Sequence, residues 1–465
     1  MNLPIHAHEY TDAHWDKHLN CTREFLRQPS ISAQNVGVRT TADLLRGWLE
    51  AHGARVEFHG RETHPILFAE WNVGAPKTLL VYGMYDVQPV DGQPWTTPPF
   101  AAEIWNHPEG GESLVARGAC NSKGPLMAFL HAVEALRATS GLPVNIKWTI
   151  EGEEEIGSFA LPEFYRAHRE RLAADAALEP FWSQYTLDGQ PHITLGTKGV
   201  MGLEFICRSG EWGGPNEVTH SSYGPWIASP AWRLLQALGT MVNEHQELTV
   251  DGIPPLGEIG PDDEQLLRKL AESFDNQQTL ARLGTARFKR DLPPFELLRH
   301  IEFAPMLNIN GLKSGYLGEG AHTIIPTEAR ALCDLRMATG MKVEETYQAV
   351  KDHLARHGYG DIEVLMDSGY PAAKTPLAAP VVQALIAAYR AHGFEPAIRP
   401  MEASATPYFL FTDVLRLDFS WGGLGTAGGS HGPDEWCSVA GLKALEKSAA
   451  TFLVAFAEYG GLVRE

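Results

Sequence analysis

The sequence predicts an α/β protein in which a mostly parallel sheet is flanked by helices and a smaller α+β region is inserted. Three observations support this fold class. Apolar runs alternate with amphipathic stretches over residues 1–190, the same rhythm returns after Lys374, and the segment between them has a different pattern. A chain of 465 residues is also too long for one compact core. We therefore expect two domains, the second inserted into the first.

The first elements follow from apolar periodicity. Residues 78–82 and 144–150 are short apolar runs typical of buried strands. Between them, Pro125 begins a stretch in which apolar residues at helical spacing share one face: Leu126, Phe129, Leu130 and Val133. A strand, a helix and a second strand in this order predict parallel pairing.

The middle of the chain begins with a segment rich in Gly, Pro and polar residues (209–225), which predicts a surface loop. A helix is expected from Ser229, with Pro230 in its first turn. Strand, helix and strand patterns then suggest a small α+β unit, over residues 331–337, 343–357 and 362–366. The chain should end in a helix over about 440–459.

Composition excludes several classes of function. The 38 Lys and Arg against 57 Asp and Glu give a net charge of −19, which argues against nucleic acid and anionic membranes as partners. The first twenty residues have neither a basic start nor an apolar core, so no signal peptide is expected, and no apolar run is long enough to span a membrane. The five scattered cysteines contain no CxxC pair and fit a reducing cytoplasm.

Acidic residues and one histidine stand where predicted strands end. Asp86 follows the run 78–82, and the acids 153–155 follow 144–150; Glu179 and His431 occupy similar positions further on. A run of three acids is usually a solvated turn, and a glycine-flanked histidine is often an ordinary loop residue. At the rim of a sheet, however, carboxylates are costly unless they are paired or bound to metal. The spacing therefore indicates a polar site at this rim.

Eight short motifs occur in an order that resembles a known family. They are GMYDVQPV, WTTPPF, RGACNSKGPLMAFLHA, EGEEEIGS, GPNEVTHS, HTIIP, DLRM and SHGPDE. Together they resemble the co-catalytic zinc metallopeptidase superfamily of carnosinase-like dipeptidases, acetylornithine deacetylase and glutamate carboxypeptidase. The resemblance extends over nearly the whole chain and is nearest to the carnosinase-like dipeptidases.

The resemblance implies a role for each matching residue. In the family, two zinc ions share an aspartate, and a glutamate deprotonates a water that attacks an amide carbonyl. By position, Glu154 matches this base, Glu155 and His431 match ligands of one metal, and Glu179 matches a ligand of the other. The remaining matches are Asp86, which clamps a ligand histidine, His220, a lid histidine supplied in dipeptidases by the other subunit, and Thr323 and Arg336, which hold the substrate carboxylate.

Two ligand positions depart from the family pattern. Met84 stands where a zinc-binding histidine is expected, and Asn121 where the bridging aspartate is expected. Taken by itself, Met84 is most simply explained by core packing. A thioether is a weak zinc ligand and a neutral amide is a poor bridge. The family's REGGSIP is also replaced by residues 401–407 (MEASATP), a stretch of the substrate wall that includes Ser404.

Two interpretations of these departures remain open. Either the site has been rebuilt as an atypical metallopeptidase or amidohydrolase, or catalysis has been lost and a small-molecule-binding or regulatory homologue remains. For the rebuilt hydrolase we expect at most one tightly bound divalent metal per chain, zinc or manganese, at Glu155 and His431. Cys120, beside Asn121, is either a thiolate ligand or a buried structural cysteine. Asp86, without its histidine, is held by backbone donors or has turned toward Asn121 or the cleft water.

The resemblance also implies the domain roles and partners. We expect a catalytic domain at residues 1–191 and 376–465 and an inserted lid and dimerisation domain at 192–375, forming a homodimer. The substrate is expected to be small and to carry a carboxylate, as in a dipeptide, an N-acyl amino acid or an aromatic amine or amide.

Overall fold

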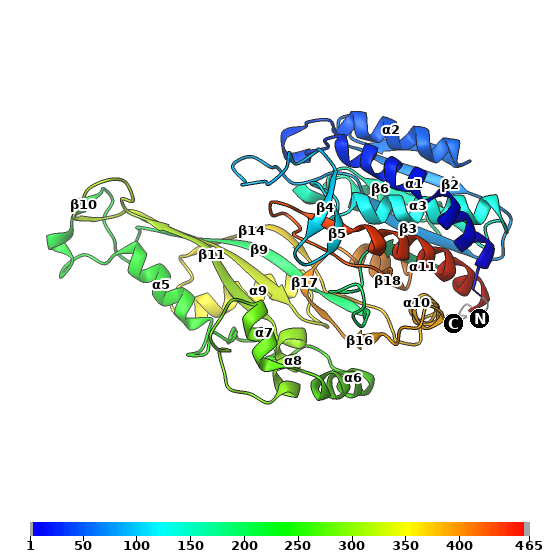
Figure 1. Cartoon of the computed structure of the whole chain (residues 1–465). Coiled ribbons are helices and arrows are strands. Elements are labelled where there is room, and N and C mark those ends of the chain that lie inside the picture. Colours follow the sequence, from blue (N-terminus) through cyan, green and yellow to red (C-terminus); the bar gives the residue numbers. More distant parts are fainter. Residues whose placement is uncertain (1–2, 460–465) are drawn as a thin grey trace. The chain divides into compact units, whose positions relative to one another are not determined.

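The computed structural model describes residues 3–459 and divides the chain into two compact units (Figure 1). The larger unit comprises Met1–Leu195, Thr375–Ile398 and Leu410–Glu465, and the smaller comprises Gly196–Lys374 and Arg399–Phe409. The predicted boundaries differ from these mainly at Arg399–Phe409, which the sequence assigned to the first domain. This segment joins the smaller unit because its strand β17 (Glu402–Ala405) pairs in parallel with β9 (Gly196–Arg208).

The larger unit contains a six-stranded sheet in the order β1-β2-β6-β3-β7-β18. The strands are β1 (Arg55–Gly60), β2 (Pro65–Trp71), β6 (Asn145–Glu151), β3 (Thr78–Met84), β7 (Ala176–Pro180) and β18 (Phe419–Gly422). The strands β6, β3, β7 and β18 are parallel, and β2 runs antiparallel to both of its neighbours, β1 and β6, so the mostly parallel sheet is confirmed. The apolar run of β3 is buried along nearly its whole length, as a central parallel strand requires.

Helices cover this sheet. They are α1 (Ile5–Arg27), α2 (Val38–Ala51), α3 (Lys123–Ala138), α4 (Leu161–Ala167), α10 (Pro380–Ala391) and α11 (Val439–Glu458). α1, α3 and α11 pack against one another (Figure 1). The predicted helix at Pro125 begins two residues earlier, and residues 123–136 are all buried because α3 lies between the sheet and other helices.

A second, antiparallel sheet in the larger unit was not predicted. Its order is β19-β20-β5-β4, with β4 (Glu103–His107), β5 (Gly111–Val115), β19 (Ala427–Gly428) and β20 (Trp436–Ser438). Because β20 pairs with β5, the segment before β20 lies beside the segment after β5. This pairing positions part of the site described below. Two short strands, β8 (His192–Thr194) and β16 (Ala397–Arg399), form a further pair.

The smaller unit is an α+β structure around the antiparallel order β11-β13-β9-β14, with β15 and β17 also paired to β9. Its other strands are β10 (Thr219–His220), β11 (Met306–Ser314), β12 (Ile324–Ile325), β13 (Glu328–Met337), β14 (Glu363–Tyr370) and β15 (Ala373–Lys374). Its helices are α5 (Pro230–Thr240), α6 (Pro261–Glu272), α7 (Asn276–Arg282), α8 (Pro294–Phe303) and α9 (Val343–Arg356). The loop predicted at 209–225 contains the short strand β10, which pairs with β12.

Residues 3–459 contain no helix with the length and apolar character needed to cross a membrane.

Candidate active site

The predicted acids of the larger unit follow three neighbouring parallel strands. β3 lies between β6 and β7, and these strands lead to Asp86, to the turn at Glu154 and Glu155, and to Glu179 within β7. Because the strands run in the same direction, their carboxyl ends meet at one edge of the sheet. The structure therefore brings these residues to one edge of the sheet.

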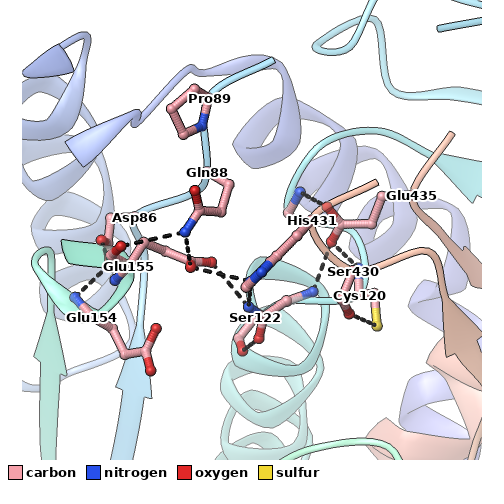
Figure 2. A network of polar contacts seen from close by, with 12 residues as sticks. Asp86, Gln88, Pro89, Cys120, Ser122, Glu154, Glu155, Ser430, His431 and Glu435 are labelled. Carbon is pink, nitrogen blue, oxygen red and sulfur yellow. Dashed lines mark hydrogen bonds and ion pairs between the residues drawn. The ribbon is translucent and has the colours of Figure 1, made fainter. Parts of the chain in front are cut away.

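Asp86 is fully buried and accepts two backbone hydrogen bonds. The N–H groups of Glu154 and Glu155 donate to its two oxygens at 3.2 and 3.0 Å (Figure 2). Burial raises the pKa of Asp86 to about 7, although these amides favour the ionised form. Asp86 thus fixes the turn that carries both glutamates. Met84, the last residue of β3, is buried and lies in register with Glu151 of β6.

Glu155, His431 and Asn121 converge on one point. His431 Nε2 lies 3.2 Å from Glu155 Oε2, and Asn121 Nδ2 lies 3.0 Å from Glu155 Oε1 and 3.2 Å from His431 Nε2. Gln88 Nε2 donates to Glu155 Oε2 at 2.8 Å (Figure 2). The hydrogen bond with Glu155 raises the pKa of His431. Three side chains from separate segments therefore form a tight triangle.

Glu435 holds the loop that presents Asn121. It is buried and accepts hydrogen bonds from the backbone N–H groups of Gly118, Cys120 and Asn121 at 2.8–3.1 Å, and from the Arg117 guanidinium at 2.8 Å. Sequence reasoning missed this residue, although it belongs to SHGPDE and Arg117 to RGAC, two of the motifs quoted above. The available signal was a charged residue next to apolar ones in each motif: Arg117 after LVA and Glu435 before WC.

Cys120 is buried, and its Sγ accepts a hydrogen bond from Ser430 Oγ at 3.1 Å (Figure 2). Burial raises the pKa of this thiol to about 12. The burial of Cys120 and its contact with Ser430 fit the structural alternative for this residue.

Glu154 lies among several other acids. Figure 2 shows its carboxylate pointing away from the Glu155–His431 pair. Burial raises the pKa of Glu154 well above its usual value, and the charges of Glu155, Glu151, Asp86 and Glu179 add to the effect. Burial likewise raises the pKa of Glu151 to about 8, even though Tyr82 donates to it at 2.6 Å. The cluster holds more negative charge than its hydrogen-bond donors compensate.

Glu179 is buried on β7. Within residues 3–459, two sets of three His, Cys, Asp or Glu residues have ligand atoms within 4.8 Å of one another, and neither set contains Glu179. Glu179 therefore does not share one ligand position with Glu155 and His431 in this structure.

The remaining predicted residues belong to the smaller unit. His220 Nε2 lies 3.2 Å from Thr323 Oγ1, and both residues are exposed at the paired strands β10 and β12. The Ser222 N–H donates to His220 Nδ1 at 3.1 Å, so the other ring nitrogen carries the proton in the neutral imidazole. Arg336 lies near the far end of β13 and donates to Asp334 at 3.0 Å, and Ser404 is exposed on β17. The structure pairs His220 with Thr323 but not with Arg336.

Comparison with known proteins assigns the family. Residues 80–457 match Peptidase family M20/M25/M40. The chain belongs to this family. It is 29% identical to human Beta-Ala-His dipeptidase over 374 residues, covering 74% of this chain and 70% of that protein. It is 30% identical to Cys-Gly metallodipeptidase DUG1 from Saccharomyces cerevisiae over 283 residues, covering 60% of this chain and 56% of that protein.

Solved structures of M20 proteins share the fold. The M20 metallo-carboxypeptidase Sso-CP2 from Sulfolobus solfataricus superposes with a TM-score of 0.85 at 30% identity, over 95% of this chain and 99% of that one. Human carnosine dipeptidase 1 gives a TM-score of 0.77 at 25% identity, over 97% and 98%. The chain is therefore an M20 hydrolase, and the expected resemblance and fold class are confirmed.

Proposed function

We propose that this M20 chain hydrolyses an amide or related C–N bond in a small substrate that carries a carboxylate, with at most one tightly bound divalent metal ion in its active site. The contacts among Glu155, His431 and Asn121 carry this proposal, with the half-buried Glu154 in the same turn as Glu155. Dipeptides are the first substrate class to consider, because the relatives named above are dipeptidases. N-acyl amino acids and aromatic amides follow, because residues 401–405 give the smaller unit a less polar stretch.

The triangle fits one metal ion. Its two possible ligand atoms, His431 Nε2 and Glu155 Oε2, are 3.2 Å apart, about the spacing of ligands that each lie roughly 2 Å from a common ion. Without a cation, the contacts conflict: an unprotonated His431 Nε2 turns a lone pair toward Glu155, and a protonated one faces the Asn121 N–H group. An ion bound by Glu155, His431 and the Asn121 amide oxygen, with the amide turned, would remove this conflict.

The second family position does not fit an ion. Met84 is buried in the core, and Asn121 brings no charge with which to bridge. Glu179 is the one remaining strong ligand of that set, and one carboxylate does not make a tight site. The proposed reaction therefore uses no second ion.

Glu154 is the general base and acid in this proposal. Its pKa, raised by burial and by neighbouring acids, suits a group that accepts a proton from the attacking water near neutral pH. The water oxygen bonds to the carbonyl carbon, the C–N bond breaks, and Glu154 returns the proton to the leaving nitrogen. A bound divalent ion would polarise the carbonyl and lower the pKa of the water. Asp86 holds Glu154 in place by accepting a hydrogen bond from the Glu154 backbone N–H.

Substrate binding by the smaller unit supports a homodimer. From Glu328 to Arg336, β13 extends for about 26 Å at 3.3 Å per residue, and Thr323 lies before its start. No dipeptide can touch both the His220–Thr323 pair and Arg336 of one chain's smaller unit. We propose that Arg336 binds the carboxylate in its own chain, while the His220–Thr323 pair completes the site of a second chain.

Exposed apolar side chains on the same sheet fit a dimer contact. Leu332 and Leu365 lie in one cross-strand row, opposite Glu204 from either side, and are 54% and 43% exposed. The other face of this sheet is covered by helices α5 and α9. Two exposed leucines on either side of one acid, on the uncovered face of this sheet, fit an interaction surface.

The alternative is a catalytically inactive binding homologue. It is favoured by one observation: the Asn121 amide already links Glu155 to His431 by hydrogen bonds. In that case Asn121 closes the metal position, and the protein retains only the substrate-binding groups.

The metal content of the purified protein tests the proposal. Protein prepared without chelator should contain about one zinc or manganese per chain more than the variant Glu155→Gln/His431→Ala. The double variant Met84→His/Asn121→Asp restores both family ligands and should exceed that variant by about two. An excess near two in the unaltered protein would contradict the single-site proposal. A panel of dipeptides, acyl amino acids and aromatic amides, with Glu154→Gln as the blank, separates the hydrolase from the binder. Equal rates in protein and blank would favour the binder.

Complementation tests the dimer. His220→Ala and Glu154→Gln should each be inactive, but co-expressed chains form heterodimers with one intact site, giving about a quarter of normal activity for random pairing. No recovery in chains shown to associate, or a monomeric mass at micromolar concentration, would contradict the shared site.

A further inference from the structure

A second cluster of ionisable side chains lies among the helices of the larger unit. His18 on α1 and His131 and Glu134 on α3 are 1%, 2% and 9% exposed. Their helices pack directly against each other and against α11. This cluster shares no residue with the candidate active site, and neither the family resemblance nor the proposed function accounts for it.

The two carboxylate oxygens of Glu134 have different contacts. Its Oε1 accepts from Lys17 at 2.6 Å and from Tyr10 at 3.1 Å. Its Oε2 lies 3.6 Å from both His18 Nε2 and His131 Nδ1, too far for a good hydrogen bond. The ligand atoms of these three residues all lie within 4.8 Å of one another. Tetrahedral zinc ligands, each about 2.1 Å from the ion, are separated by about 3.4 Å, close to the 3.6 Å between Glu134 Oε2 and each of the two histidine nitrogens.

Several ring nitrogens in this cluster lack partners. Among the described residues, His18 Nε2 and both nitrogens of His131 are buried without a hydrogen bond. Leaving a buried polar atom unpaired costs about 1–3 kcal/mol in general, so such atoms point to a missing partner. Three in one place are an independent sign of a bound ligand.

Glu446 on α11 orients His18. His18 Nδ1 lies 2.9 Å from Glu446 Oε1, which also accepts from Thr11 Oγ1 at 2.6 Å. A carboxylate at Nδ1 keeps the proton on that nitrogen, so the lone pair is on Nε2, 3.6 Å from Glu134 Oε2. A carboxylate behind the ring is the usual support of a metal-binding histidine. A lone pair that faces a carboxylate is repulsive unless a cation stands between them.

We propose that His18 Nε2, His131 Nδ1 and Glu134 Oε2 bind a divalent metal ion, zinc by its ligand chemistry, which joins α1 to α3. Imidazole and carboxylate ligands suit zinc, and the buried position is that of a structural site. The two rings are stacked in parallel with centroids 4.2 Å apart, so each must rotate to aim its lone pair at the ion. His52 Nε2, 2.9 Å from the same Glu134 oxygen, is the nearest further nitrogen.

The competing occupant is a proton. Glu134 and Glu446 carry two negative charges, and Lys17 supplies one positive charge. Protonated His52, whose Nδ1 and Nε2 lie 2.7 Å from the Trp48 carbonyl oxygen and 2.9 Å from Glu134 Oε2, would supply the second without metal. The two occupants differ in what the protein retains after purification.

Zinc analysis in an active-site background distinguishes them. The full-length variant Glu155→Gln/His431→Ala removes the ligands of the candidate active site. After exposure to zinc and removal of excess, it should retain about one zinc per chain. Adding His131→Ala should reduce this to near zero. Adding His8→Gln should leave the zinc content unchanged. His8 lies on α1, as His18 does, but it contacts Lys447 and Thr451 instead of the cluster.

A second variant and two further measurements test the site if His131→Ala does not fold. If His131→Ala does not give a folded protein by circular dichroism, His18→Gln replaces it, with the same expected loss of zinc. In the background variant, cobalt should give the absorption bands of a tetrahedral site, and zinc about a hundredfold above its Kd should raise Tm by roughly 5 °C. No zinc in the background variant, or equal zinc after either histidine substitution, would overturn the proposal and leave the proton as the occupant. The metal content at Glu155 and His431 is a separate measurement.

Discussion

The larger unit contains two buried polar clusters with opposite electrostatics. At the strand ends, acids outnumber basic groups, and burial raises the pKa of Asp86 to about 7 and that of Glu151 to about 8. Among the helices, burial of Glu134 acts in the same direction, but His131, His52 and Lys17 outweigh it and lower the pKa of that carboxyl. Burial alone therefore does not set the charge of an acid; the donors around it do. Uncompensated acids are typical of a reactive site, and compensated ones of a framework.

The largest expected effect is on kcat, and it distinguishes Glu154 from the neighbouring Glu153. Glu154→Gln should lower kcat on the best substrate of the panel by about a thousandfold, roughly 4 kcal/mol, because proton transfer is lost. Glu153→Gln is the matched control. Glu153 accepts from the Ala160 N–H at 3.0 Å and pairs with Arg61 at 3.2 Å, so its loss should change kcat less than about fivefold. Equal losses in both variants would mean that the acidic run acts only through folding.

A smaller effect concerns stability. Glu435→Gln should lower the free energy of unfolding by about 3 kcal/mol, because it leaves the buried Arg117 guanidinium without its charge partner. Denaturant titration measures this loss. Glu50→Gln is the control: Glu50 pairs with Arg46 on the surface of α2, with both side chains more than 40% exposed, and should cost less than about 0.5 kcal/mol. A similar cost for both would show that the Glu435 network is not buried in solution.

The sequence predicted the fold and the edge of the sheet that carries the site, because apolar periodicity and strand-end acids are local signals. Met84, Asn121, Glu155 and His431 were named from motifs. The roles of Glu435 and Gln88 depend on the pairing of β20 with β5 and on a side chain reaching across a loop, which no local pattern encodes. The helix cluster was missed for the same reason.

The pH dependence of stability tests a half-buried base outside both clusters. Burial lowers the pKa of His392 to about 4, and His8 and Lys447 add to the effect. The unfolded chain, with a pKa near 6.5, therefore binds more protons between pH 6.5 and 4, and stability falls as pH falls through this range. The full shift corresponds to about 3 kcal/mol, which partial exposure reduces to roughly 2.

His392→Gln removes this titration. Its loss of unfolding free energy between pH 7 and 4.5 should be roughly 2 kcal/mol smaller than that of the unaltered protein, as measured by urea titration at each pH. His6→Gln, an exposed residue of α1, should leave the loss unchanged. An equal loss in the His392 variant would mean that this side chain is protonated in the folded protein.

The smallest expected effect concerns the link between Asp86 and catalysis. Asp86→Asn replaces one of two acceptor oxygens with an amide group that cannot accept from a backbone N–H. The turn that carries Glu154 and Glu155 should then shift, lowering kcat by about tenfold, or 1.4 kcal/mol. Because Asp86 acts through the turn, metal content at Glu155 should fall together with kcat, and the pH profile of kcat should keep its shape. A tenfold loss with full metal content and an altered pH profile would instead assign Asp86 a direct part in proton transfer.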